Sequence, residues 1–327
     1  MAQTQASNHG PPYIPTIAMV GGHPITSLDV PISAVFLAFY LLAAIGNMAI
    51  FQTNRIRGHK FLMSWAMFGF CMARNATFVL RIVWAYRPHN ARLIIAVQIF
   101  AGAGVLVSYI VVLLLSLRIF RATHPELGWN PKLRMLCKAL YILLFISFIL
   151  TICFTIESFY TLNLKIKNVA LWVQRTSSLV QLLFNITSLI IFSLSIFLSR
   201  PSSPENFGAG SLKKKTAILS IVTFFVLFII GFRFGVAWTD PRPASNPAWF
   251  DSKPAFYVIE YAFELAIIYI LLVTRFDRIF WVPNGSAKAG DYQMWSGYEQ
   301  KDEGERLSSS GEESVLQLKP YSNNEER

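Results

Sequence analysis

The sequence predicts an all-α protein in which seven transmembrane helices form one bundle. Three observations support this prediction. Of the 327 residues, 54% are hydrophobic and only 14% are charged, whereas a soluble domain is about 25% charged because its surface faces water. Seven stretches reach the roughly 20 mostly apolar residues that a spanning helix needs. Basic residues gather in alternate connections between these stretches, as they do in proteins that cross a membrane repeatedly.

The predicted spans follow one another without an intervening soluble domain. They are Pro31–Phe51, Phe61–Ala85, Leu93–Leu117, Ala139–Phe159, Val169–Leu198, Thr216–Trp238 and Ala255–Thr274. The fifth is long enough to tilt. Residues 1–30 form an extracellular segment, and 31–280 form the membrane domain. Residues 281–327 turn polar and Ser-rich, a composition that cannot bury enough apolar surface to fold, so we expect a disordered tail.

The connections between the spans give the orientation. Those at 52–60, 118–138 and 200–215, together with the tail from 275, hold 19 Lys and Arg residues, whereas the N-terminus and the other connections hold six. Because basic residues favour the cytoplasmic side, the N-terminus is predicted outside and the C-terminus in the cytosol. The net charge of +11 is then explained by the inner connections, and nucleic acid is not an expected partner.

Ionisable side chains inside the predicted spans indicate the candidate site. Each costs about 2.5–3.5 kcal/mol on insertion scales, so such residues usually face a bundle interior or a wet cavity. Most lie toward the outer ends of their spans, which predicts a polar cavity open to the outside. With two residues of a polar stripe on the fifth span, the candidate ligand- or proton-binding residues are Arg74, Arg81, Glu157, Arg175, Gln181, Asn185, Arg233, Glu260 and Glu264.

A purely structural interpretation of these charges stays open. Arginines and glutamates can pair across helices only to neutralise one another, and a polar stripe can hold helices together. The run Ala101-Gly102-Ala103-Gly104 is interpreted as helix packing, since small residues allow close contact between helices.

The predicted spans lack the residues that several intramembrane chemistries require. All five histidines lie outside the predicted spans, and no predicted span contains an Asp or a Lys. This argues against an intramembrane zinc hydrolase, an aspartyl protease and a retinal Schiff base. Nucleotide-binding loops are also absent. We therefore expect neither an enzyme, nor a cofactor, nor a metal site.

Several local motifs resemble a fungal seven-span family catalogued as a domain of unknown function (3112). They are Arg57-Gly58-His59-Lys60-Phe61, Cys71-Met72-Ala73-Arg74-Asn75, Leu80-Arg81-Ile82-Val83-Trp84-Ala85, Arg121-Ala122-Thr123-His124-Pro125, the stretch from Phe256-Tyr257 to Glu264, and Val282-Pro283-Asn284-Gly285-Ser286. The resemblance spans about Gly21 to Ser286. It implies a fungal origin and seven spans, and it implies no activity, because that family has none assigned.

The layout is more distantly similar to the fungal lipid-translocating-exporter family, whose members are linked to resistance to membrane-active lipids and drugs. An Arg late in the sixth span and acidic residues in the seventh are notable in that family, and Arg233 and Glu260 occupy comparable places here. The local motifs do not match well enough to transfer residue roles.

Two functions therefore stay open, beside a purely structural or scaffolding role. The first is a transporter or lipid-handling protein of the plasma membrane whose outer cavity takes a small amphipathic or anionic ligand. The alternative is a seven-helix receptor-like sensor that signals through its cytosolic loops and tail. Ser309 and Ser310 each have an acidic residue three positions on, which predicts phosphorylation by a cytosolic kinase and a signalling partner at the tail.

Overall fold

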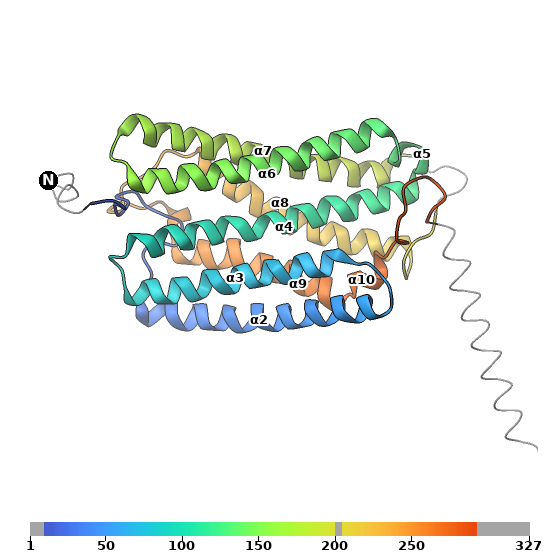
Figure 1. Ribbon diagram of the computed structural model, residues 1–327, viewed down its shortest axis with the longest axis horizontal. Coiled ribbons are helices and arrows are strands. Elements are labelled where there is room, and N and C mark those ends of the chain that lie inside the picture. Colours follow the sequence, from blue (N-terminus) through green and yellow to red (C-terminus); the bar gives the residue numbers. More distant parts are fainter. Residues whose placement is uncertain (1–9, 200–204, 293–327) are drawn as a thin grey trace, which may run out of the picture.

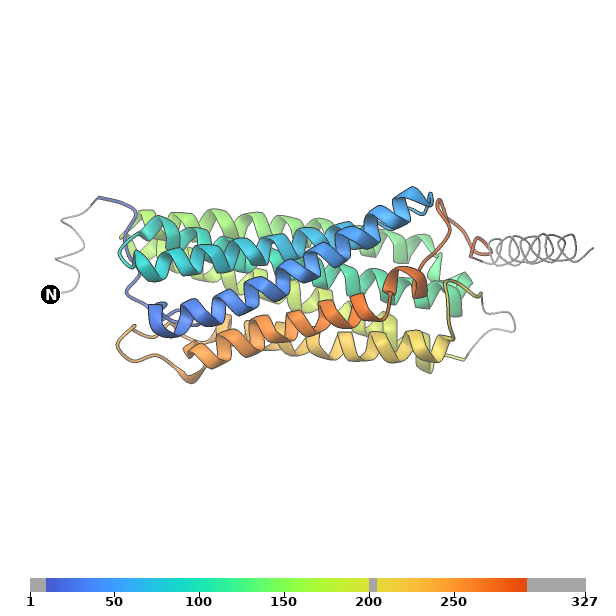
Figure 2. The ribbon, with the colours of Figure 1, turned by 90° about the horizontal axis from the view of Figure 1, so that it is seen from below.

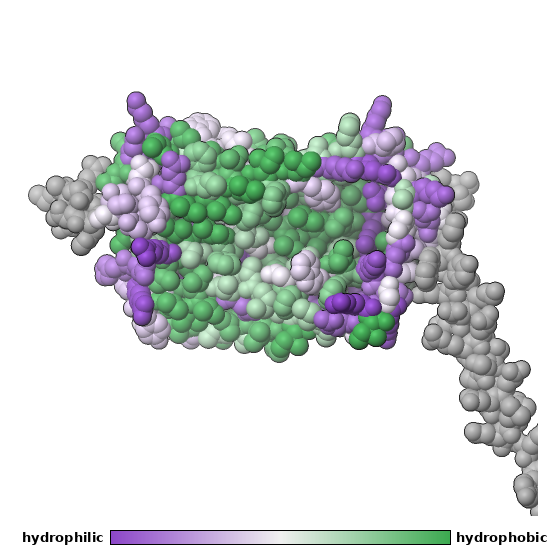
Figure 3. Space-filling view, in the orientation of Figure 1, coloured by the Kyte–Doolittle hydropathy of each residue, from purple (hydrophilic) through white to green (hydrophobic). Residues whose placement is uncertain are grey.

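The computed structural model describes residues 10–199 and 205–292, and these form a bundle of helices aligned along one axis (Figure 1). Seven helical segments in this part of the chain are long and apolar enough to cross a membrane. On the face shown in Figure 3, apolar side chains form a broad band across the middle of the bundle, and polar side chains gather at both ends. This distribution matches a bilayer core between two aqueous layers. The chain is thus built as an integral membrane protein.

Six spans are single α-helices, and the seventh has two parts. The α-helices are α2 (Thr26–Ile56), α3 (Leu62–Tyr86), α4 (Ala91–Thr123), α6 (Pro131–Tyr160), α7 (Leu164–Phe197) and α8 (Leu212–Trp238). The seventh span joins a π-helix, η2 (Ala255–Ala262), to α9 (Phe263–Val273). Three short helices lie in the connections: α5 (Pro125–Gly128), the 3-10 helix η1 (Trp249–Asp251) and α10 (Phe276–Ile279).

The helix α4 is the central element of the bundle. It packs against α3, α6, α7 and α8, and it has the largest buried share of the seven spans. The helix α6 has the smallest and turns Ile142, Phe145 and Ile149 outward, as expected of a helix whose apolar face contacts lipid. The segment η2–α9 lies between α2 and α8 (Figure 2). Residues of α3, α4, α8 and η2–α9 therefore meet inside the bundle.

Most helices extend beyond the predicted spans, and one extension changes the interpretation of the sequence. The helix α2 begins at Thr26, and the carboxylate of Asp29 accepts the backbone N–H of Ile25 at 2.7 Å. An acidic side chain in the first turn satisfies a helix donor that has no partner within the helix. The expectation that no span contains an Asp was therefore wrong, because the span was predicted to start at Pro31, which lies inside α2.

We name the two ends of the bundle, the N-terminal end and the C-terminal end, after the chain segments that cover them. The N-terminal end holds residues 10–25, which pair with the connection after α8: Ile17 bridges Pro243, and the N–H of Ala18 donates to the carbonyl of Arg242. The C-terminal end holds α10 and residues 282–292.

The first part of the expected tail is attached to the C-terminal end. The Asn284 amide donates to the carbonyl of Gly58 at 2.9 Å and accepts the N–H of Lys60 at 3.1 Å, while the backbone N–H groups of Gly290 and Tyr292 donate to the buried Glu205 carboxylate. Local side-chain bonds to backbone thus hold a segment whose composition alone suggested disorder. The remainder of the tail, with Ser309 and Ser310, lies outside the described residues.

Candidate functional site

A buried ion pair joins α3 to the seventh span near the middle of the bundle. The Arg74 guanidinium donates from Nε to Oε2 of Glu264 and from Nη2 to Oε1, both at 2.6 Å. Neither side chain is exposed to solvent. Two parallel charge-assisted hydrogen bonds fix both the distance and the plane of such a pair. Arg74 and Glu264 are therefore held as one rigid unit.

The small residues of α4 make room for this pair. A Cβ on Gly104 would lie 2.9 Å from Cζ of Arg74, which is closer than carbon atoms can approach comfortably. The carbonyl of Ala101 accepts Nη1 of Arg74 at 2.8 Å and Nη2 of Arg233 at 3.2 Å, which a carbonyl with two lone pairs allows. The run predicted to serve helix packing thus also contacts both arginines.

A second and looser ion pair joins α8 to η2. Nε of Arg233 lies 3.3 Å from Oε1 of Glu260, but the geometry of this contact does not make a hydrogen bond. The side chains are 18% and 10% exposed. Glu260 precedes Glu264 by four residues on the same span, so the tight and the loose pair lie about one turn apart. The Arg233–Glu260 pair is therefore the more exposed and the less tightly bonded of the two pairs.

Two buried tyrosine hydroxyls lie near the two ion pairs. The Tyr109 and Tyr261 hydroxyls have no hydrogen-bond partner within the described part of the chain. Both tyrosines are close enough to interact electrostatically with all four charges. A buried polar group without a partner is costly, so these hydroxyls indicate a place where water or a ligand group binds.

Arg81 belongs to a separate cluster at the N-terminal end. Its Nη2 donates to Asp29 at 2.9 Å and to the carbonyl of Gly21 at 2.8 Å, and its Nε donates to the Tyr257 hydroxyl at 3.1 Å. Lys253 also pairs with Asp29. Since Gly21 lies in the segment that covers the helix ends, Arg81 attaches that segment to the bundle. This arrangement favours a structural role for Arg81.

Sequence reasoning missed Asp29 and placed Lys253 in an outer connection, apart from the buried charges. Asp29 stands two residues before Pro31, and an acidic residue just ahead of an early Pro is a helix-start signal. That signal could have moved the start of the first span, and Asp29 would then have been counted among the buried charges. Nothing in the sequence indicated its partner Lys253.

The other four candidates lie apart from the two ion pairs. Arg175 pairs with Asp240 at 2.8 Å, and the Asp240 side chain is 96% exposed. Glu157 is exposed and has no ion pair within the described residues. The Asn185 amide donates to the carbonyl of Gln181, one turn earlier on α7. The structure thus brings together Arg74, Arg233, Glu260 and Glu264. No ion pair or hydrogen bond within the described residues joins the other four candidates to them.

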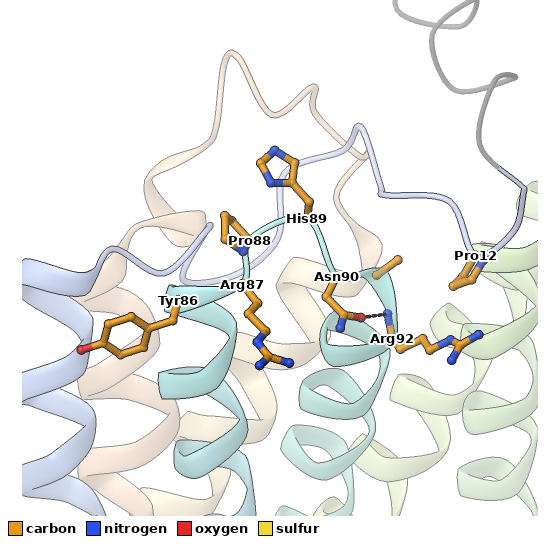
Figure 4. A pocket seen from close by; sticks show the side chains of 8 residues that line it. Pro12, Tyr86, Arg87, Pro88, His89, Asn90 and Arg92 are labelled. Carbon is orange, nitrogen blue, oxygen red and sulfur yellow. Dashed lines mark hydrogen bonds between the residues drawn. The ribbon is translucent and has the colours of Figure 1, made fainter.

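Two pockets lie at the ends of the bundle, and none of the nine candidates lines either of them. The N-terminal pocket, of about 650 Å³, lies around the connection between α3 and α4. Its side chains do not converge: Tyr86, Arg87, His89 and Arg92 point in different directions (Figure 4). It is a shallow surface without a built polar site.

The C-terminal pocket, of about 340 Å³, is lined by Lys60, by Leu114, Leu117, Arg118 and Arg121 of α4, by segment 282–286 and by Tyr292. Three of these side chains are basic. At the level of the sequence, Lys60, Arg118 and Arg121 contributed to the orientation, and Lys60 and Arg121 also to the family resemblance, but none of them was assigned to a site. No spacing in the sequence brings Lys60 to α4.

No group of three His, Cys, Asp or Glu side chains in residues 10–199 and 205–292 is arranged to hold a metal ion. No family model, no curated protein and no solved structure matches this chain.

Proposed function

We propose that this chain is a seven-helix transporter or lipid-handling protein of the plasma membrane that binds an anionic or amphipathic ligand at Arg233 and Glu260. The supporting observation is the contrast between the two ion pairs. Arg74 and Glu264 form a closed bidentate pair, whereas the Arg233 and Glu260 side chains approach without a hydrogen bond and keep some exposure. A cation that is incompletely bonded by its own protein is the group best able to take an anionic ligand.

In the proposed cycle the Arg233 guanidinium turns from Glu260 to the phosphate or carboxylate of the ligand. Glu260 then loses the cation that stabilised its charge, and in a membrane interior it takes up a proton. The Tyr109 and Tyr261 hydroxyls donate hydrogen bonds to the same ligand. Release of the ligand restores the pair and returns the proton, so ligand movement is coupled to pH.

The local backbone supports this assignment. Glu260 lies in the π-helix η2, whereas Glu264 lies in the regular helix α9. π-helical turns within α-helices often mark functional sites. With the N-terminus outside, as the basic connections predict, the Arg233–Glu260 pair lies on the outer side of the Arg74–Glu264 pair.

The test uses the full chain in phosphatidylcholine liposomes that contain a trace of fluorescent phosphatidylserine. Dithionite destroys fluorescence only in the outer leaflet, so lipid transfer appears as loss of the protected signal. We expect the wild type to accelerate the transfer in a pH-dependent way. Glu260→Gln should lose most of this rate and its pH dependence, because it cannot carry the proton. Glu157→Gln, an exposed carboxylate outside the site, should behave as the wild type.

A wild-type rate equal to that of empty liposomes, for both fluorescent phosphatidylserine and fluorescent phosphatidylcholine, would reject lipid handling. A transfer rate and a pH dependence in Glu260→Gln equal to those of the wild type would show that Glu260 takes no part in the mechanism.

The alternative is a seven-helix receptor-like sensor, and one observation favours it. Residues 10–25 cover the helix ends, where Gly21 is bonded to Arg81 and to Asp251. A closed end suits a protein that transmits a change of shape more than one that passes a solute. A sensor would move no lipid in the liposome assay, and Glu260→Gln would abolish the response of the cell to a ligand. The predicted kinase sites Ser309 and Ser310 belong to this alternative.

A further inference from the structure

The C-terminal pocket differs from the interior site in the state of its basic side chains. In the interior, Arg74, Arg81 and Arg233 each have a carboxylate within 4 Å. None of the three basic residues that line the C-terminal pocket has such a partner within the described part of the chain. The pocket therefore concentrates uncompensated positive charge.

Neutral contacts hold two of these cations in place. Arg118 donates from Nη1 to the carbonyl of Phe280 at 2.5 Å, and its guanidinium lies 5.3 Å from the centre of the Phe61 ring. Arg121 donates from Nε to the carbonyl of Gly128 and lies 4.4 Å from the centre of the Trp129 ring. Arg121 also contacts the Tyr292 hydroxyl. These contacts fix the guanidinium groups without neutralising them, and each guanidinium has more N–H donors than the contacts use.

Three elements bring the cations together. Arg118 and Arg121 are three residues apart on α4 and so lie on one face of that helix. Lys60 comes from the connection before α3, and its backbone is fixed by the Asn284 side chain. The Lys60 side chain is exposed, and no contact of its ammonium group is recorded within the described residues. It is a free cation at the mouth of the pocket.

One carboxylate beside the pocket, that of Glu205, does not neutralise these cations. Glu205 is buried, and its two oxygens accept the backbone N–H groups of Gly290 at 2.7 Å and Tyr292 at 3.3 Å. It therefore holds the segment that forms one wall of the pocket, and it is not ion-paired with the three cations.

We infer that the C-terminal pocket binds a phosphate-bearing anion between Lys60, Arg118 and Arg121. Two guanidinium groups match the several oxygens of a phosphate, and a lysine ammonium adds a mobile point charge. A cavity of about 340 Å³ is in the range of small-ligand sites. Leu114 and Leu117 line the same pocket, so it also offers apolar contact to a group next to the phosphate.

Two sources could supply this phosphate: the headgroup of an anionic lipid or a free phosphorylated metabolite. The test separates them with the purified full chain in nanodiscs. One arm uses phosphatidylcholine nanodiscs with added inorganic pyrophosphate, at an ionic strength kept constant with sodium chloride. The other arm compares phosphatidylcholine nanodiscs with nanodiscs that also contain phosphatidic acid. Each arm measures the rise in the temperature of thermal unfolding, because a ligand that binds only the folded state stabilises it.

The principal variant is Lys60→Gln, because an exposed side chain without recorded contacts can be changed without loss of folding. Its matched control is Lys132→Gln, since Lys132 is an exposed lysine at the start of α6 outside the pocket. Losing one charge-assisted contact should weaken the apparent affinity roughly tenfold. Arg121→Gln should weaken it at least as much, and its unfolding temperature without ligand reports whether it folds.

Stabilisation by pyrophosphate that is reduced in Lys60→Gln and unchanged in Lys132→Gln assigns the site to a soluble phosphate. The same pattern with phosphatidic acid alone assigns it to a lipid headgroup. If neither probe stabilises the wild type, or if Lys60→Gln and Lys132→Gln respond equally, the inference is overturned. The site lies at the end of the bundle opposite to the N-terminal cluster. The result of this stabilisation test therefore does not depend on lipid transfer through Arg233 and Glu260.

Discussion

Replacement of Glu264 by Gln tests whether the tight ion pair is structural. The substitution keeps the shape of the side chain and one acceptor oxygen, but it removes the negative charge and one of two 2.6 Å charge-assisted hydrogen bonds from Arg74. Such a bond contributes about 1.5–3 kcal/mol, and breaking a buried pair on one side costs about 3–5 kcal/mol because the other charge is left unpaired. Since both side chains are fully buried, we expect a loss of about 3 kcal/mol in the free energy of unfolding.

The assay is reversible unfolding of the purified chain in mixed micelles of increasing dodecyl sulfate content, followed by tryptophan fluorescence. The control is Glu157→Gln, which changes an exposed carboxylate without an ion pair and should stay within about 0.5 kcal/mol of the wild type. The double variant Arg74→Gln/Glu264→Gln should recover part of the loss, since no unpaired charge remains. A loss of less than about 1 kcal/mol for Glu264→Gln would refute the structural interpretation of the pair.

Three further predictions concern Gly104 beside the ion pairs, Arg81 at the N-terminal end and Asp277 at the C-terminal end. Gly104→Ala should destabilise the fold by about 1–3 kcal/mol in the same assay, because its Cβ would meet the fixed guanidinium of Arg74 at 2.9 Å; Gly102→Ala, whose Cβ would have no neighbour within 4 Å, should be neutral or stabilising. Arg81→Met should release residues 10–25 and speed their cleavage in limited proteolysis, because the hydrogen bond to the carbonyl in that segment is lost; an unchanged cleavage rate would contradict this role. Burial raises the pKa of Asp277 in α10, but the hydrogen bonds that its carboxylate accepts from Arg275 and Asn54 outweigh burial and lower the pKa below its usual range. Its stabilising contribution is therefore present above the unfolded-state pKa and lost as the pH falls through the folded-state pKa, so Asp277→Asn should destabilise the protein at neutral pH and match the wild type in strong acid.

The spans could be predicted from the sequence because lipid imposes a simple rule. A helix that crosses the bilayer must present an apolar surface over its whole length, and this rule finds each of the seven segments by composition alone. The helix ends could not be predicted as well. Beyond the apolar core, α2 and α6 continue through polar residues such as Asp29 and Lys132, which local capping and packing keep helical. The π-helical part of the seventh span has no sequence signal that we could identify.

Four of the nine candidate residues form the two ion pairs, and their pairing could not be predicted from the sequence. Helical spacing places Glu260 and Glu264 on one face of a helix, yet it does not tell which arginine each one meets. From the sequence, Arg175 was as plausible a partner as Arg233. In the structure Arg175 pairs with the exposed Asp240 instead. Partner choice depends on how neighbouring helices are rotated and shifted, and hydrophobic periodicity constrains those quantities weakly in a bundle whose outer face is apolar as well.

The boundary between η2 and α9 falls between the two glutamates of the site. A change of η2 from π-helical to α-helical winding would rotate the residues before this boundary relative to those after it. Glu260 would then move with respect to Arg233, whereas Glu264 would stay with Arg74. Such a change would therefore alter the Arg233–Glu260 pair and leave the Arg74–Glu264 pair in place. On the proposed mechanism, Glu260→Gln should therefore act on the transfer rate, whereas Glu264→Gln should act on stability.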